Sequence, residues 1–166
     1  VVGDALSPVH GAPPRVAAPA RPPAPPARPP AACVAAAVLV SPTIWRRPVI
    51  AAPRLMTDWL AAAAAARGVA VAVELNYKEG DWVGAGEPLL YLTGSFLHLV
   101  DLETLLLQKI GAACVAAYNA FTMCVDLPNV AFLAMDARHC AGTEMAELMA
   151  YAASVGSAAA RAQAGA

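Results

Sequence analysis

Proline is concentrated at the start of the chain and limits what that part can form. Ten of the 15 prolines lie within residues 1–30, many of them in Pro-Pro, Ala-Pro or Arg-Pro pairs. Because proline fixes φ and lacks a backbone N–H, such a segment can neither coil into an α-helix nor pair along a sheet. We expect residues 1–42 to be a low-complexity, disordered Pro/Ala-rich arm, and the functional alternative is a ligand for a proline-binding module.

The hydrophobic content overstates the core. Hydrophobic residues make up 59% of the chain, but 42 of the 166 residues are alanine, which buries little surface. The longest apolar run near the N-terminus, Ala31–Val40, falls short of the ~20 residues that a membrane-spanning helix needs. The net charge of −1 gives no reason to expect a nucleic-acid partner. We therefore expect neither a membrane nor a nucleic acid as partner.

Charge divides the chain into two parts. Residues 1–67 carry seven arginines and two acidic residues, a net of +5, whereas residues 68–166 carry four basic and ten acidic residues, a net of −6. Such a difference in composition usually separates two physical units. The four cysteines show no Cys-x-x-Cys spacing, so reduced thiols in a cytoplasmic protein are expected rather than a disulfide framework or a zinc module.

Local signals after residue 43 predict helices and strands. Pro53 and Gly68 suit the start and the end of a helix, and Asp101 and Thr143 suit N-caps. The apolar run Val130–Met135 is typical of a strand buried on both faces. The predicted elements are helices over 54–67, 101–126 and 143–164, and strands over 69–75, 88–93 and 130–135.

The string GDWVGAGEPLL (residues 80–90) resembles the turn between short strands in biotinyl and lipoyl carrier domains, whose fold is a barrel-sandwich hybrid. Its glycines allow positive φ, and its valine and leucines can fill a small barrel. A carrier also needs a modifiable lysine on an exposed hairpin tip. Only Lys78 and Lys109 are available, and neither lies in a Met-Lys-Met context. A carrier module and a non-catalytic interaction module are therefore kept as alternatives.

The segment DARHCAGT (residues 136–143) is the main candidate site. It follows the predicted buried strand and precedes a helix, where α/β proteins often place their sites. Arg138 can form paired hydrogen bonds with a carboxylate or phosphate, and the amides of the helix N-terminus favour an anion. In the structural alternative, Asp136 and Arg138 merely pair to seal the end of a barrel. Adjacent His139 and Cys140 give little support to a nucleophilic pair or a zinc site.

From Arg46 onward, several stretches occur in the same order as in nicotinate phosphoribosyltransferase, a type II phosphoribosyltransferase. They are RRPV (46–49), APRLM (52–56), GEPLLYLTGSF (86–96), ETLLL (103–107), DARHCAGT (136–143) and residues 151–157. The chain resembles the N-terminal part of this family only. The resemblance implies an α+β protein with a partial barrel-sandwich hybrid domain over 43–127. The first strand and helix of an incomplete α/β barrel would follow over 128–166.

The resemblance also implies a function. The family joins nicotinate to phosphoribosyl pyrophosphate in pyridine nucleotide salvage for NAD biosynthesis, with Mg²⁺ and coupled ATP hydrolysis. Arg138 matches the family's arginine that contacts anionic substrate groups, and His139 stands where relatives often carry a second basic residue. No catalytic or metal-binding residue is assigned. Because the family's later barrel strands have no counterpart here, we expect the 166-residue chain to be an inactive fragment that self-associates or forms a homodimer.

Overall fold

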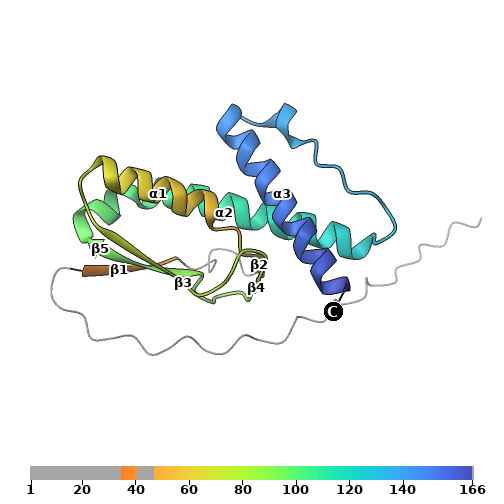
Figure 1. Cartoon of the computed structure of the whole chain (residues 1–166), viewed down its shortest axis with the longest axis horizontal. Helices are drawn as coiled ribbons and strands as arrows, with labels where there is room; N and C mark the ends of the chain where they lie inside the picture. Colours follow the sequence, from red (N-terminus) through yellow and green to blue (C-terminus); the bar gives the residue numbers. More distant parts are fainter. Residues whose placement is uncertain (1–34, 41–46, 166) are drawn as a thin grey trace, which may run out of the picture.

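The computed structural model describes residues 35–40 and 47–165, and it shows helices packed against two small sheets (Figure 1). The mixed α+β class is therefore confirmed, and no closed barrel forms within these residues. In chain order, the elements are β1 (Ala35–Val40), β2 (Val49–Ile50), α1 (Arg54–Ala66), β3 (Val71–Leu75), β4 (Trp82–Val83), β5 (Leu90–Ser95), α2 (Phe96–Asp126), the 3₁₀-helix η2 (Asp136–His139) and α3 (Thr143–Ala164).

The larger sheet has the strand order β1-β5-β3, with both pairings antiparallel. Its central strand, β5, alternates in the way a half-buried strand does, since Leu90 and Leu92 are buried and Tyr91 between them is not. Strands β2 and β4 pair separately, with Val49 opposite Val83. Strand β1 lies within the segment 1–42, for which only an arm was expected. The remainder of that segment lies outside the described residues.

Helix α1 confirms the predicted helix and covers the core beside the sheets (Figure 1). Pro53 takes the N-cap position, and Gly68 follows the helix with a φ of +63°, a conformation that glycine adopts without strain. Met56, Leu60 and Ala64 form its buried face at spacings of four residues. The packing of this face fixes the position of α1 against the rest of the core.

Helix α2 begins at Phe96, directly after β5, and not at Asp101 as predicted. The buried side chains of Leu99 and Leu102 explain the difference, because packing against the core stabilises the helix upstream of the expected cap. Asp101 instead lies inside the helix, where its carboxylate forms an ion pair with Arg67 at 2.5 Å. Gly111, near the centre of α2, does not interrupt it.

Helix α3 confirms the last predicted helix and packs across α2 (Figure 1). Its buried face consists largely of small residues, among them Ala152, Gly156 and Ala160. Small side chains allow two helix backbones to approach closely. The high alanine content thus serves helix packing as well as helix propensity.

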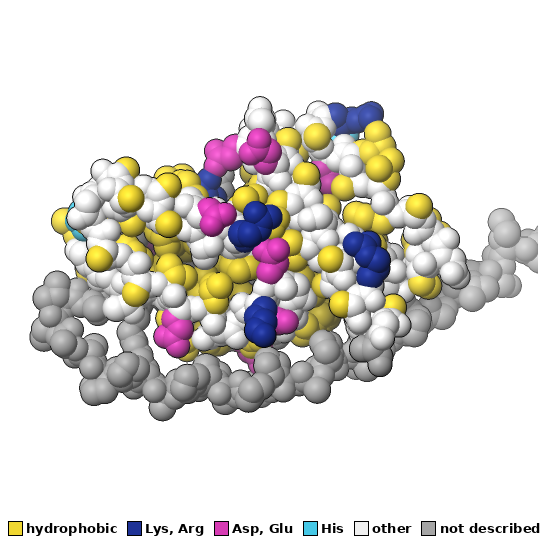
Figure 2. All heavy atoms as spheres, in the orientation of Figure 1, with side chains coloured by type: hydrophobic (Ala, Val, Ile, Leu, Met, Phe, Trp, Pro, Cys, Tyr) yellow, Lys and Arg dark blue, Asp and Glu magenta, His cyan; other side chains and the backbone are white. Residues whose placement is uncertain are grey.

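The predicted buried strand over 130–135 is wrong. Residues 131–135 have no regular secondary structure, and their side chains are exposed, with Val130 62% and Leu133 76% accessible. A strand requires a neighbouring strand for its backbone hydrogen bonds. No strand of the described chain lies beside this segment. Hydrophobic side chains are visible on the surface over the connection between α2 and α3 (Figure 2). Within 35–40 and 47–165, no helix has the length and apolarity needed to cross a bilayer.

Candidate anion-binding site

The predicted site folds as a compact turn that leads into α3. The 3₁₀-helix η2 contains Arg138 and His139. After it, the Cys140 amide donates to the Ala137 carbonyl at 3.4 Å, and the Cys140 thiol donates to the Asp136 carbonyl at 3.2 Å. Gly142 then takes a φ of +96°, which turns the chain into the helix. These local contacts hold the two basic side chains just before the start of α3.

Arg138 and His139 are both exposed. The ion pairs of the described chain are Arg54–Glu79, Arg67–Asp101 and Lys109–Glu144, and none involves Arg138 or Asp136. The structural alternative, in which Asp136 and Arg138 pair with each other, is therefore wrong. An unpaired guanidinium keeps all its donors available for an external carboxylate or phosphate.

The N-terminus of α3 adds backbone donors next to Arg138. The N-cap position is taken by Gly142 rather than by Thr143, and no side chain caps it, so the predicted Thr143 cap is wrong by one residue. The amides of Thr143, Glu144 and Met145 form no hydrogen bond with other described residues, whereas the Ala146 amide donates to Gly142. Free first-turn amides and the positive end of the helix dipole both favour an anion.

The thiols give no support to nucleophilic chemistry. Cys114, Cys124 and Cys140 are free in the described chain, and Cys33 lies outside it. Burial raises the pKa of the Cys114 thiol to about 11, which keeps it protonated and unreactive at neutral pH. The contact of the Cys140 thiol is with a backbone carbonyl, not with His139.

No group of three or more His, Cys, Asp or Glu side chains comes together in the part of the chain that the structure describes. Mg²⁺ is usually bound through one or two carboxylates together with substrate phosphates and water, and no residue of this chain is assigned to the Mg²⁺ that the resemblance implies.

The lysines occupy positions unlike those of a carrier. Lys78 is exposed in the connection from β3 to β4, but these two strands belong to different sheets, so the connection is not a hairpin tip. The Lys109 side chain is only 18% accessible and is paired with Glu144. Neither lysine presents the free hairpin amine that biotinyl or lipoyl attachment requires.

The GDWVGAGEPLL string forms a turn held by one carboxylate. Glu87 accepts a hydrogen bond from the Gly84 amide at 3.1 Å and another from the Tyr77 hydroxyl. Gly80 and Gly86 take φ values of +91° and +82°, as the sequence predicted for turn glycines. The role of this string is thus structural.

One polar cluster was missed at the sequence level. The Tyr151 hydroxyl of α3 donates to Glu79 and accepts from the Arg54 amide at 3.1 Å. The Arg54 guanidinium lies 4.6 Å from the centre of the Tyr151 ring and pairs with Glu79 at 3.6 Å. The three residues come from α1, α3 and the turn before β4, so no local pattern could have joined them. The cluster fixes α3, and hence the candidate site, against the rest of the fold.

At the level of structure, this chain is similar to a known protein. The solved structure of NadC from Streptococcus pyogenes matches with a TM-score of 0.57 and 18% sequence identity, over 75% of this chain. The match covers 42% of the NadC chain, so the present chain spans less than half the length of that protein. No protein-family model and no curated protein sequence matches. At this identity, the likeness to NadC shows a shared fold.

Proposed function

We propose that this chain forms part of a phosphoribosyltransferase of NAD metabolism, in which Arg138 and His139 bind an anionic substrate group. The observation that carries the proposal is the exposed, unpaired Arg138 directly before the free amides of α3. The fold likeness to NadC supports the same enzyme class, since NadC is a quinolinate phosphoribosyltransferase. In this proposal, the two small sheets are part of a barrel-sandwich-like domain, and α3 belongs to the barrel that follows it.

The proposal also concerns which pyridine carboxylate is the substrate. The sequence resemblance favours nicotinate, whereas the structural neighbour acts on quinolinate. Both molecules are pyridine carboxylates, and a guanidinium can bind either through paired hydrogen bonds. We propose nicotinate as the substrate, because the resemblance over the DARHCAGT segment includes Arg138 itself.

Phosphoribosyl transfer requires residues that bind and orient the substrates, and it does not require a protein nucleophile. Transfer of a phosphoribosyl group passes through an oxocarbenium-like state at the anomeric carbon, while pyrophosphate leaves. Arg138 and His139 would orient an anionic group and balance its charge, and the amides of Thr143 and Glu144 would donate to the same group. The charge of Glu144 itself is balanced by Lys109 and opposes the anion less than a free carboxylate would.

Binding and turnover are tested separately. Nicotinate, quinolinate and phosphoribosyl pyrophosphate are titrated into the ¹⁵N-labelled chain, with Mg²⁺ present and absent, and amide shifts are followed by NMR. We expect saturable shifts at residues 137–145 and a loss of affinity of one to two orders of magnitude in Arg138→Ala. Arg161→Ala, a substitution of an exposed arginine near the end of α3, is the matched control. Equal affinities of the two variants would remove Arg138 from the site.

Formation of nicotinate mononucleotide by the 166-residue chain is measured in parallel. The resemblance leads us to expect none, since it covers only the N-terminal part of the family. Detection of the mononucleotide would overturn that expectation while leaving the binding proposal intact. Absence of binding by all three ligands would overturn the binding proposal itself.

A further inference from the structure

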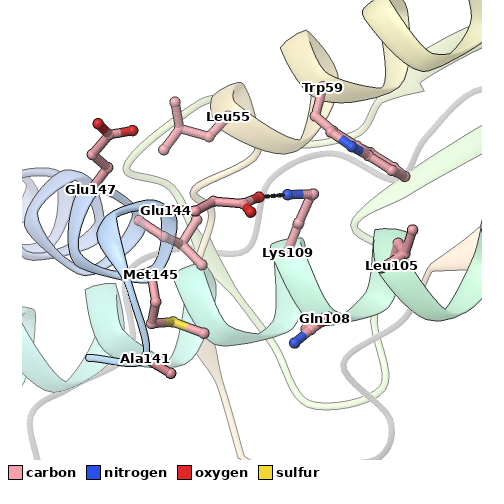
Figure 3. Close-up of a pocket in the computed structure, with 10 residues that line it drawn as sticks. Leu55, Trp59, Leu105, Gln108, Lys109, Ala141, Glu144, Met145 and Glu147 are labelled. Carbon is pink, nitrogen blue, oxygen red and sulfur yellow. Dashed lines mark hydrogen bonds and ion pairs between the residues drawn. The ribbon is translucent and has the colours of Figure 1, made fainter. Parts of the chain in front are cut away.

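A pocket of about 360 Å³ lies between α1, α2 and the first turns of α3 (Figure 3). Arg138 and His139 do not line it, but Glu144 and Met145 do, so it lies next to the site proposed above and shares the first turn of α3 with it. Its volume is in the range of pockets that hold small molecules. Side chains from all three helices line it.

The walls of the pocket combine apolar side chains with one aromatic face. Leu55 and Trp59 come from α1, and Met145 and Leu148 come from α3. The Lys109 ammonium lies 5.2 Å from the centre of the Trp59 ring. The Lys109 ammonium thus lies over one face of the Trp59 ring, an arrangement that the quadrupole of an indole ring favours.

The charges around the pocket leave a net negative balance. Lys109 is paired with Glu144 from the start of α3, so these two charges offset each other. Glu147, one turn further along α3, has no ion-pair partner among the residues that the structure describes. Figure 3 shows the Glu147 carboxylate at the edge of the pocket, directed away from the pair formed by Lys109 and Glu144. The three charges therefore sum to −1, and the excess charge is located at Glu147.

We propose that this pocket binds a small organic ammonium ion with a flat apolar body. The ammonium group pairs with Glu147, and the body packs against Leu55, Trp59 and Leu148. A carboxylate ligand would face two glutamates and only one lysine, which is already paired. A neutral ligand of the same shape would gain the apolar contacts but no ion pair. Charge complementarity thus selects the cation over its isosteres.

Three ligands of similar shape and different charge test this selection. They are 2-phenylethylammonium, 3-phenylpropionate and 2-phenylethanol, each titrated into the ¹⁵N-labelled full chain at pH 7. We expect saturable shifts at Leu55, the Trp59 indole and Leu148 with the ammonium, weaker binding of the alcohol and none of the carboxylate. Binding of the carboxylate or the alcohol with equal or higher affinity overturns the proposal. So does the absence of a saturable response to the ammonium.

Two substitutions then test whether Glu147 is the residue that pairs with the ammonium group. Glu147→Gln keeps the shape of the side chain and should weaken ammonium binding about two- to fivefold, as expected for a solvent-exposed ion pair. Glu103→Gln, at an exposed glutamate of α2 outside the pocket, is the control and should leave affinity unchanged. Equal effects of the two variants count against Glu147 as the partner.

Lys109→Met should raise the affinity of the pocket for the ammonium ligand. Removal of the lysine charge frees Glu144 and exposes the Trp59 face, so ammonium affinity should rise about two- to fivefold. A merely structural role for Lys109 would lower affinity or leave it unchanged, and either result contradicts the proposal. If this variant fails to fold, as judged by circular dichroism, the comparison of Glu147→Gln with Glu103→Gln decides the question alone.

Discussion

Gly156 of α3 lies against the backbone carbonyl of Ala117 on α2, with no room for a side chain between them. A Cβ atom at Gly156 would stand 2.0 Å from the Ala117 oxygen and 3.0 Å from the Cβ of Ala120. Neither partner can move aside cheaply, because one is a backbone atom in the middle of a long helix. The distance between α2 and α3 is therefore set by a glycine.

Gly156→Ala should consequently destabilise the fold, although alanine has the higher helix propensity. The added methyl group forces the two helices apart, and overpacking of this kind costs about 1–3 kcal/mol or more. Urea unfolding followed by circular dichroism measures the change in the free energy of unfolding.

Gly111→Ala is the matched control, because it makes the same chemical change on α2. A Cβ at Gly111 meets nothing within 4 Å. Only helix propensity acts there, and the substitution should stabilise the protein by about 0.5–1 kcal/mol. Stabilisation of both variants would show that α2 and α3 are not packed as closely as described.

The Tyr151 hydroxyl connects α3 to α1 and to the turn before β4. Tyr151→Phe removes the hydrogen bond to Glu79 and the one from the Arg54 amide, and should cost about 1–2 kcal/mol of unfolding free energy at pH 7. Tyr118→Phe is the control, since the Tyr118 ring packs edge-on against Trp82 and its hydroxyl has no hydrogen-bond partner among the described residues. Its effect should be below that of Tyr151→Phe.

The difference in unfolding free energy between the wild-type protein and Tyr151→Phe should depend on pH. Burial, followed by the hydrogen bond to Glu79, raises the pKa of Tyr151 above its ordinary range. The folded state therefore holds this proton more tightly than the unfolded state, where the pKa is about 10. The stabilisation is complete below about pH 10 and is lost as the pH rises above it. The unfolding free energies of the two proteins, measured from pH 7 to pH 11, should approach each other as the pH rises. A difference that stays constant would contradict the raised pKa of Tyr151.

Cys114 should be the slowest of the described thiols to react. With a pKa of about 11, its thiolate fraction at pH 8 is roughly one in a thousand, and its side chain is buried as well. Cys124 and Cys140 are only partly buried. Alkylation with iodoacetamide at pH 8, followed by peptide mass spectrometry, should label Cys124 and Cys140 first. In urea, the rates should become similar, because the protection of Cys114 depends on folding.

The sequence predicted those elements whose signals are local. Helix α1 is bounded by Pro53 and Gly68, and both act through their own backbone conformations. Turn glycines such as Gly86 could be identified for the same reason. The start of α2 was misplaced because burial of Leu99, a tertiary effect, outweighs the capping signal of Asp101. The two-residue strands β2 and β4 depend on each other and carry too few residues to show a pattern.

The candidate site, too, was predicted only where its signals are local. The turn with Arg138 and His139 lies before α3, as its position in the sequence indicated, but the strand expected before it does not form. An apolar run states only that a segment favours burial, and a strand forms only where another strand supplies its hydrogen bonds. The pairs Tyr151–Glu79 and Lys109–Glu144 join residues far apart in the chain, which a single sequence cannot reveal.

The exposed apolar residues between α2 and α3 should drive self-association. Leu127, Val130, Leu133 and Met135 are all more than half accessible in one connection, and such a surface favours contact with another apolar surface. Leu133→Lys should therefore shift the mass measured by light scattering toward that of a monomer. Leu97→Lys is matched in exposure, at 75% against 76%, but lies at the start of α2. Leu97→Lys should leave the measured mass unchanged if the connection between α2 and α3 is the contact surface. A strictly monomeric wild-type chain would contradict the prediction.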